Sequence, residues 1–478
     1  MLFTSLEFLF LFLPVTLAVY FVLPKALRNY WLLAVSLFFY GWGEPVFLFF
    51  MLASIVFNYL MALWIDKKPL GSKARSRILA LDVLGNLSVL FVYKYMNFFT
   101  ATMHAALPFT RSMFGVTQFV LPIGISFFTF QAMSYVIDVY RGEGRGAAVQ
   151  KNPAYVGLYV SFFPQLIAGP IVRYTTVEQE IKKRSITMDS FSEGVYRFLL
   201  GFNKKMLLAN TLSVVADKAF AARELSVAMA WLGIVCYTLQ IFFDFGGYSE
   251  MAIGLGRMFG FHFLENFDYP YISKTITEFW RRWHMSLGTW FRDYVYFPLG
   301  GSRVSSRRRL IFNLFVVWLL TGVWHGANWT FILWGVLYGV ILTAEKILDL
   351  PKRLPKHRIA ALGYQAFTLL AVMLGWVLFR ADSLGKAWQY ILTMFGMGGG
   401  ALVDDLARFY FREYFVLLAA GVVCSTPVFK VIGKKLSDRA VLREIGALVM
   451  GLAQLALFVV GISQLVMNAH NPFIYFNF

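Results

Sequence analysis

Apolar residues recur in blocks of about 20 along nearly the whole of the 478-residue chain. Five of these blocks come first, at about 3–23, 30–43, 46–65, 78–97 and 118–140. A helix of about 20 residues spans the hydrocarbon core of a bilayer, and the blocks lack the period-two alternation of a membrane β-barrel. The pattern therefore predicts an all-α polytopic membrane protein.

Basic residues gather in the short loops between these blocks, as in the cluster that contains Lys67 and Arg77. Cytoplasmic loops carry an excess of Lys and Arg, so the first five spans alternate without conflict if Met1 lies outside. Further blocks lie near 198–222, 228–256, 310–324, 328–345, 359–380, 411–432 and 443–467. About 11–12 spans in one membrane domain, 1–467, are predicted; an even count of twelve places the tail 468–478 outside with Met1.

The block at 155–174 breaks the alternation, because Lys182 follows it and belongs on the same side as Lys151. Pro164 interrupts a helix within this block. A re-entrant or broken segment explains both facts. Irregular backbone at membrane depth is tolerated where it is buried in protein or lines a cavity, so Gln165 becomes a candidate residue in the wall of a site.

Composition agrees with a membrane protein, since 59% of the residues are hydrophobic and 15% are charged, against about 25% charged in soluble domains. The net charge of +18 resides in loops between apolar blocks, so it indicates topology and attraction to anionic lipid or an anionic cofactor rather than nucleic acid. Cys236 and Cys424 lie far apart inside apolar blocks, which supports neither a disulfide framework nor a zinc site. No metal site is predicted.

The first candidate for chemistry is His284, in a stretch too charged to span a membrane. If 276–291 is one helix, its apolar residues recur at the spacing of an amphipathic surface element. These residues are Ile276, Trp280, Trp283, Leu287 and Phe291. His284 lies among these aromatics, whereas Arg281 and Arg282 point away from them. A histidine near the water line of such a helix is the alternative interpretation.

The second candidate, His325, follows an apolar run of only about 15 residues, roughly 22 Å of helix against about 30 Å of hydrocarbon. His325 is therefore expected inside the membrane. Burial disfavours the charged imidazole, and a neutral imidazole can act as a general base. The alternative is a hydrogen-bonded structural histidine between helices. Asp244, inside another apolar block, either faces the interior or lies at the membrane edge.

Other chemistries lack their motifs. The chain contains no HExxH, GxSxG or Walker A sequence, which argues against a zinc metalloprotease, a serine hydrolase of the elbow type and a P-loop ATPase.

Four long motifs carry a resemblance to a known family: "PQLIAGPIVRY" (164–174), "DFGGYSEMAIGLGRMFGF" (244–261), "NFDYPYISKTITEFWRRWHMSLGTWFRDYVYFPLGGSR" (266–303) and "TGVWHGANWTFILWGVLYG" (321–339). They resemble the membrane-bound O-acyltransferase (MBOAT) family, in its bacterial branch of alginate and peptidoglycan O-acetyltransferase membrane subunits. The resemblance covers nearly the whole chain. It implies a central tunnel and a catalytic core at about 120–345.

The resemblance also implies roles for individual residues. His325 matches the family's catalytic histidine and His284 a second characteristic polar position. The terminal "FIYFNF" is similar to a short motif of this branch, so that Tyr475 becomes a candidate transient acyl carrier. A phenol has a pKa of about 10, close to a thiol at about 8.5, so an aryl ester keeps much of the transfer potential of a thioester. An interfacial aromatic is the alternative.

The function expected from these residues is the transfer of an acetyl group from cytoplasmic acetyl-CoA across the membrane, for O-acetylation of a cell-envelope polysaccharide. Acetyl-CoA would be a substrate, with no bound cofactor, and its phosphates would be drawn by arginines. The residues expected at the donor and acceptor sites are Arg281, Arg282, Arg303, Arg307, Trp280, Trp283, Trp324, Asn328, Gln165 and Asp244. Trp324 and Asn328 are the candidates for contacts to the oxyanion.

The expected location is the bacterial cytoplasmic membrane with both termini outside, and the expected partner is an extracytoplasmic SGNH-type acetyltransferase. Two alternatives remain open. One is D-alanyl-type transfer from a carrier protein. The other is a transporter or flippase of a polysaccharide precursor, which would favour paired broken helices in two repeated halves.

Overall fold

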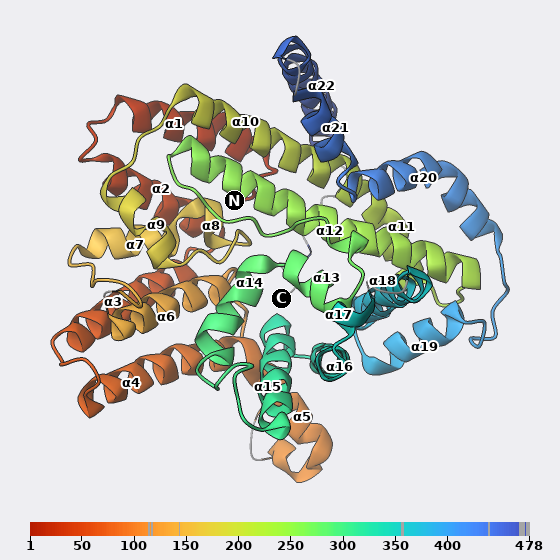
Figure 1. Ribbon diagram of the computed structural model, residues 1–478, viewed down its shortest axis with the longest axis horizontal. Coiled ribbons are helices and arrows are strands. Elements are labelled where there is room, and N and C mark those ends of the chain that lie inside the picture. The colour runs from red at the N-terminus through yellow and green to blue at the C-terminus, as the bar shows by residue number, and fades with distance from the viewer. Residues whose placement is uncertain are drawn as a thin grey trace. The chain divides into compact units, whose positions relative to one another are not determined.

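The computed structural model describes residues 1–112, 115, 118–142, 144–354, 358–437, 440–467 and 474. Within these ranges the regular elements are all helices and no strand occurs (Figure 1). The predicted all-α class is confirmed.

Contacts divide the chain into two compact units, Met1–Val195 with Met251–Leu264, and Tyr196–Glu250 with Glu265–Phe478. Two helices, α10 (Met188–Asn203) and α12 (Val227–Met258), belong in part to each unit. No change of composition marks the three boundaries, two of which fall inside α10 and α12. The prediction of a single domain over 1–467 remains a prediction.

In the described part of the chain, six helices are long and apolar enough to cross a membrane. They are Phe47–Asp66, Lys73–Ala106, Val227–Met258, Trp329–Ile347, Arg358–Arg380 and Glu444–Val466. A seventh is added if Asp405–Cys424 and Val428–Lys435, which meet at 59°, form one bent span. The chain is thus a multi-pass membrane protein by the length and composition of its helices.

Several predicted spans form shorter helices, which is why this number is below the 11–12 expected. The block at 3–23 becomes η1 (Phe8–Phe12) and the ten-residue α1 (Leu13–Val22), which ends just before Pro24. The block at 118–140 contributes only α6 (Ile125–Arg141), because Gly124 has a left-handed φ of 73° and the helix begins after it.

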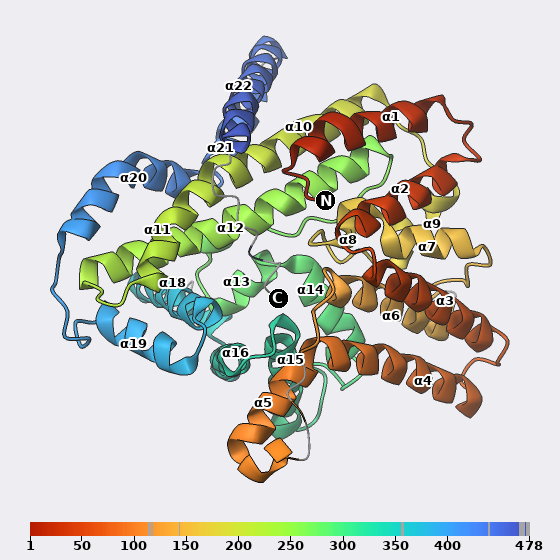
Figure 2. The same ribbon diagram turned by 180° about the vertical axis from the view of Figure 1, so that it is seen from behind.

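The first unit is built around α3, α4 and α6, which lie side by side in both views (Figures 1 and 2). Its helices are α1, α2 (Arg28–Gly43), α3 (Phe47–Asp66), α4 (Lys73–Leu90), η2 (Phe91–Tyr95), α5 (Met96–Ala106), η3 (Pro108–Ser112), α6, α7 (Pro153–Ser161), α8 (Phe163–Leu166) and α9 (Tyr174–Lys182). The buried guanidinium of Arg75 donates to the carbonyl oxygens of Ile65, Lys68, Val139 and Tyr140 at 2.6–3.1 Å. It thereby joins the ends of α3 and α6 through α4.

The segment 155–174 is broken, as predicted. Helix α7 ends at Ser161, Phe162 has an extended ψ of 113°, and the four-residue α8 follows. Every residue from 156 to 172 is buried. The hydroxyl of Tyr159 donates to the carbonyl of Val172 at 2.9 Å, which satisfies part of the irregular backbone from within the first unit.

The second unit contains η4 (Lys204–Ala209), α11 (Asn210–Ala221), η5 (Pro270–Ile272), α13 (Ile276–Arg282), α14 (Met285–Phe291), η6 (Arg292–Tyr296), α15 (Arg307–His325), α16 (Trp329–Ile347), α17 (Leu350–Arg353), α18 (Arg358–Arg380), α19 (Leu384–Met394), α20 (Asp405–Cys424), α21 (Val428–Ser437) and α22 (Ala440–Val466). Helices α15 and α16 form a hairpin that packs backbone against backbone. A Cβ atom at Gly322 would lie 2.5 Å from the carbonyl oxygen of Phe331, and one at Gly335 would lie 2.5 Å from that of Trp318. Only glycine permits this approach at both positions.

Candidate active site

His325 is the last residue of α15 and lies at the tip of the hairpin. The helix ends there because Gly326 is extended, with φ −173° and ψ 157°. The side chain is 3% exposed. Its ring centroid lies 5.0 Å from those of Trp324 and Trp334 and 5.2 Å from that of Phe379. The predicted short helix that ends at this histidine is confirmed, and α15 is not among the helices long and apolar enough to cross a membrane.

His284 separates two helices instead of lying within one. The prediction of a continuous helix over 276–291 is wrong, since α13 ends at Arg282 and α14 begins at Met285. Between them His284 adopts a left-handed conformation, with φ 45° and ψ 53°. A non-glycine residue in this region is strained by about 1 kcal/mol or more, so the surrounding structure must hold it.

The segment 266–268 holds this break from both sides. The N–H of Asp268 donates to the carbonyl of Arg282 at 2.9 Å, and the N–H of Met285 donates to the carbonyl of Asn266 at 2.9 Å. These bonds replace helical ones at the break. The apolar periodicity continues through it, because Trp283 and Leu287 are still buried, and periodicity alone therefore could not reveal the interruption.

The side chain of Asn266 determines which ring nitrogen of His284 carries the hydrogen. Its Oδ1 accepts from the N–H of Ser286 at 3.2 Å and from the Ser286 hydroxyl at 2.9 Å, and it lies 3.1 Å from Nδ1 of His284. An amide oxygen only accepts, so Nδ1 of His284 carries the hydrogen and Nε2 keeps the lone pair. Nε2 is buried and has no hydrogen-bond partner in the described chain. Burial lowers the pKa of His284 to about 3, so the ring is neutral near pH 7.

The two histidines, 41 positions apart in the sequence, meet on one tryptophan. The ring of Trp324 lies 6.0 Å from that of His284 and 5.0 Å from that of His325. The ring centroid of Phe245, from α12, lies 4.7 Å from that of His284. The structure thus brings together the two residues that the sequence singled out, in surroundings that are almost entirely aromatic.

Trp280 and Trp283 belong to the aromatic cluster behind these histidines. Trp280 packs at 4.9 Å from Trp318 and 5.3 Å from Trp334, and Trp334 also contacts His325. Trp283 is buried against Trp376 at 4.9 Å. Their observed contacts are those of aromatic packing.

Asn328 and Gln165 make defined hydrogen bonds within the protein. Asn328 is the N-cap of α16: its Oδ1 accepts from the N–H of Thr330 at 3.1 Å, and its Nδ2 donates to the carbonyl of Asp382 at 2.9 Å. Gln165, in the first unit, donates from Nε2 to the carbonyl of Tyr159 at 2.6 Å. Cap signals in "GANWT" could have suggested the first of these roles.

The predicted arginines differ in their availability. Arg282 is engaged by Glu278 at 3.0 Å and Asp268 at 3.3 Å. The other three, Arg281, Arg303 and Arg307, are exposed. They are the positions of this set at which an anion could bind without displacing an acidic side chain.

Asp244 lies in the interior, which is one of the two positions that the sequence allowed. It is 1% exposed, and its Oδ1 lies 2.6 Å from Nζ of Lys205. Its Oδ2 accepts from the N–H of Ile474 at 2.9 Å. Tyr475, the candidate carrier, falls outside the described residues.

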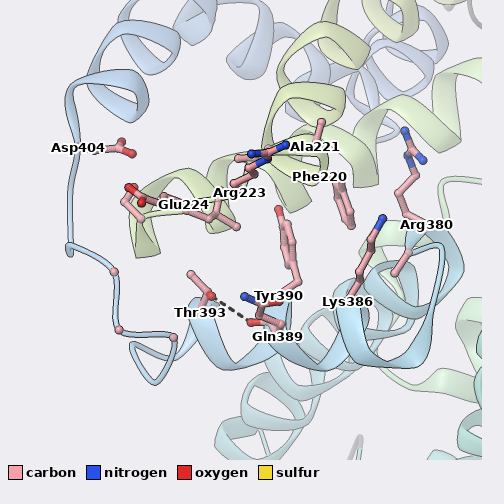
Figure 3. Close-up of a pocket in the computed structure, with 18 of the residues that line it drawn as sticks. Phe220, Ala221, Arg223, Glu224, Arg380, Lys386, Gln389, Tyr390, Thr393 and Asp404 are labelled. Carbon is pink, nitrogen blue, oxygen red and sulfur yellow. Dashed lines mark hydrogen bonds between the residues drawn. The ribbon is translucent and has the colours of Figure 1, made fainter.

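A groove of about 1180 Å³ opens on the second unit where the ends of α11, α18 and α19 meet (Figure 3). Figure 3 shows Arg380 and Lys386 at one end and Glu224 and Asp404 at the other. Arg380 pairs with Asp217 at 2.8 Å. The wall at 380–382 adjoins the histidine, because Phe379 contacts His325 and Asp382 accepts from Asn328. Sequence reasoning did not find this groove.

Among the described residues, no group of three or more His, Cys, Asp or Glu side chains is placed to hold a metal ion. The groups gathered at the site are the two imidazoles, the amide of Asn266 and the surrounding aromatic rings.

The fold and the site define a helical membrane protein with two buried histidines at one aromatic centre, and comparisons with known proteins identify its family. The model of the membrane-bound O-acyltransferase family matches residues 147–384. This range includes both histidines, Asn266 and the α15–α16 hairpin.

The similarity to one relative extends over the whole length of the chain. A protein of Azotobacter vinelandii named "Probable alginate O-acetylase AlgI" is 40% identical, with 100% of each chain covered. The chain belongs to the membrane-bound O-acyltransferase family and is an O-acyltransferase. A peptidoglycan O-acetyltransferase of Helicobacter pylori is 33% identical over 90% of this chain and 87% of its own. A teichoic acid D-alanyltransferase of Bacillus subtilis is 30% identical over 54% of this chain and 68% of its own.

Proposed function

We propose that this protein takes an acetyl group from a cytoplasmic thioester, acetyl-CoA, and delivers it to the other side of the membrane for O-acetylation of a cell-envelope polysaccharide. The relatives with full-length similarity are named as O-acetyltransferases of alginate and peptidoglycan. The observation that carries the proposal is the meeting of His284 and His325 on Trp324.

His325 is the general base in this proposal. Its neutral imidazole takes the proton of an acceptor hydroxyl while the hydroxyl oxygen attacks the thioester carbonyl carbon. The tetrahedral intermediate then collapses, the C–S bond breaks, and the coenzyme leaves as a thiolate that recovers the proton from His325. The net reaction exchanges a thioester for an oxygen ester and a thiol, with no net proton uptake.

His284 orients the acceptor. Because Nδ1 donates to Asn266, the lone pair is on Nε2, which can only accept a hydrogen bond. In this tautomer His284 binds the acceptor hydroxyl, and it does not donate to the oxyanion.

Tyr475 is the proposed first acceptor. It follows Ile474, whose side chain belongs to a buried hydrophobic cluster of the second unit that also contains Trp334 and Phe379, two of the rings that contact His325. An acetyl ester on a phenol would remain activated for a second transfer. An extracytoplasmic SGNH-type transferase would then receive the acetyl group and pass it to the polysaccharide.

The donor and the acceptor would approach the site at different places. The exposed Arg281, Arg303 and Arg307 attract the phosphates of acetyl-CoA on the cytoplasmic side. The groove next to His325 lies at the other end of α18 from Arg358, the first residue of that helix, and is the proposed approach for the partner.

The test is an assay of radiolabelled acetyl-CoA consumption and product labelling with purified protein in lipid nanodiscs. His325→Ala should lower the rate by at least about 100-fold, the effect expected of a lost general base. His262→Ala is the control, because His262 is exposed and pairs with Glu180 in the first unit. Undiminished transfer by His325→Ala would overturn the base assignment.

The same assay separates the alternatives. Labelling from a D-alanyl carrier protein but not from acetyl-CoA would favour the activity named for the Bacillus subtilis relative. Movement of a polysaccharide precursor without consumption of any thioester would favour a transporter or flippase.

A further inference from the structure

Ile474, the last described residue, is hydrogen-bonded to a buried ion pair. Asp244 accepts the N–H of Ile474 on Oδ2 at 2.9 Å, and its other oxygen lies 2.6 Å from Nζ of Lys205. Nζ of Lys205 also donates to Oδ1 of Asn210 at 2.7 Å. The exposed fractions are 1% for Asp244, 2% for Lys205 and 9% for Ile474, so water does not compete for these bonds.

A buried ion pair such as this one contributes little to the free energy of folding by itself. Removing two charges from water costs several kcal/mol per ion, and the attraction between them regains this only with good geometry and further hydrogen bonds. Here one of those further bonds comes from a residue 230 positions away, at the end of the chain. The pair is therefore complete only when Ile474 is in place.

The local backbone is shaped to bring the pair together. Lys205 lies in η4, a π-helical segment between α10 and α11. Such wide turns occur often at functional sites. One turn after Asp244, a Cβ atom at Gly247 would lie 2.7 Å from the carbonyl of Gly201 and 3.3 Å from Cβ of Lys205. Glycine at 247 thus lets α12 approach η4 closely enough for the carboxylate to reach the ammonium group.

The pair also adjoins the histidine site. Phe245, the residue after Asp244, contacts His284, and Ile474 belongs to the hydrophobic cluster that includes Trp334 and Phe379. Ile474 is thus held in two ways. Asp244 accepts its N–H, and the hydrophobic cluster buries its side chain.

We propose that Asp244 and Lys205 form the docking point that holds Ile474 in the second unit, and that both are positioning residues for acyl transfer. The positioning part rests on the proposed function, in which Tyr475 accepts the acyl group. The docking part does not, because it concerns where Ile474 is held.

The docking part is tested by hydrogen–deuterium exchange of the Ile474 amide in the full-length protein. A hydrogen bond to a charged group is worth enough that its loss should speed exchange by about 10- to 100-fold. We expect this for Asp244→Leu combined with Lys205→Met, a pair of apolar substitutions that leaves no buried charge without a partner. The single substitution Asp244→Asn should give a smaller increase, since an amide oxygen can still accept the bond.

The control is Glu250→Gln, on the same helix. Glu250 pairs with Arg197 and Lys204 and does not contact Ile474, so the exchange of the Ile474 amide should not change. Equal exchange in the native protein and in the double variant overturns the docking point, whatever the activity of either protein.

The positioning part is tested by kinetics. In the double variant the rate of acetyl transfer should fall by about tenfold or more, with the KM for acetyl-CoA unchanged, because the donor site is not touched. If Tyr475→Phe abolishes transfer but the double variant transfers normally, the positioning role is wrong. If Tyr475→Phe has no effect, the carrier step of the proposed function fails, and the exchange experiment alone decides the docking point.

Discussion

The proton on His284 is placed by Asn266, 18 positions earlier in the chain. Nε2 is then the ring nitrogen that remains available, and it can only accept a hydrogen bond. Burial keeps the ring neutral, since it lowers the pKa of His284 to about 3. Two properties of this residue, its charge and its tautomer, can therefore be tested separately.

The tautomer is tested by Asn266→Asp. A carboxylate beside Nδ1 stabilises the imidazolium, so the pKa of His284 should rise and Nε2 should become a donor as the pH falls. Because the neutral ring is the proposed active form, the acid limb of the rate profile should move to higher pH. Rates of acetyl transfer between about pH 5 and 8 measure the shift. Ser286→Ala removes a donor to Asn266 without adding charge, and its acid limb should stay in place; the same profile for Asn266→Asp would contradict the assignment.

The charge is tested by stability against pH. The folded pKa of about 3 lies below the ordinary value of 6.5, so the unfolded chain binds more protons between these values. Stability from this residue is present above pH 6.5 and falls by about 1.4 kcal/mol per pH unit below it. His284→Asn removes this dependence, so its melting temperature should fall less steeply from pH 7 to 5 than that of the native protein. If the melting temperatures of the native protein and of His284→Asn fall in parallel with pH, His284 is not the source of the pH dependence.

Residues of the site differed in how visible they were in the sequence. His284 and His325 stood out because ionisable groups are rare in apolar sequence. Asn266 did not, because its importance arises from hydrogen bonds to Ser286 and His284 that only the fold creates. Asn328 carried a recognisable capping signal, and its amide proved to be engaged by Asp382.

At the scale of elements, the α15–α16 hairpin fixes the position of His325 through a close approach of backbones at two glycines, together with ring contacts such as Trp318–Trp334 at 6.3 Å. Gly322 and Gly335 allow the two backbones to touch, so the register of the hairpin has little freedom. Elements were predictable where the signal was local, as at Pro164 in the broken segment. The break at His284 was not, because the hydrogen bonds that cause it come from Asn266 and Asp268.

Gly322→Ala tests the hairpin. The new Cβ atom would lie 2.5 Å from the carbonyl oxygen of Phe331, so the helices must move apart. We expect a loss of about 1–3 kcal/mol, as for other overpacked sites, and a fall of tenfold or more in the rate of acetyl transfer. Thermal unfolding and the transfer assay measure the two effects. Gly363→Ala in α18 is the matched control, since no atom lies within 4 Å of its Cβ position. Equal behaviour of the two variants would refute the hairpin argument.

At the scale of the whole molecule, charge and hydropathy defined the class but not the number of spans. The all-α membrane architecture followed from blocks of about 20 apolar residues. The count did not, because a left-handed glycine at 124 and a proline at 24 shorten helices that the blocks suggested. The division into two units was also invisible, because α12 passes through the boundary at 250–251.

The net charge of +18 suggests a test of how the protein attracts the phosphates of acetyl-CoA. Replacing Arg303 and Arg307 together by Gln should raise the KM for acetyl-CoA several-fold with kcat nearly unchanged, because these exposed groups attract phosphates without touching the reacting carbonyl. The effect should shrink at high salt, where such attraction is screened. Lys218→Gln removes an exposed charge elsewhere in the second unit and should leave the KM unaltered. An unchanged KM in the arginine variant would place the donor site elsewhere.

The contact between Gly322 and Gly335 also limits how this enzyme can diverge in evolution. A backbone-to-backbone hairpin tolerates no gradual adjustment, because even the smallest side chain at either position collides with a carbonyl oxygen. The groove beside it, lined by side chains such as Glu224, Gln389 and Asp404, has no such restriction. Side chains along the groove can therefore change while the position of His325 stays the same.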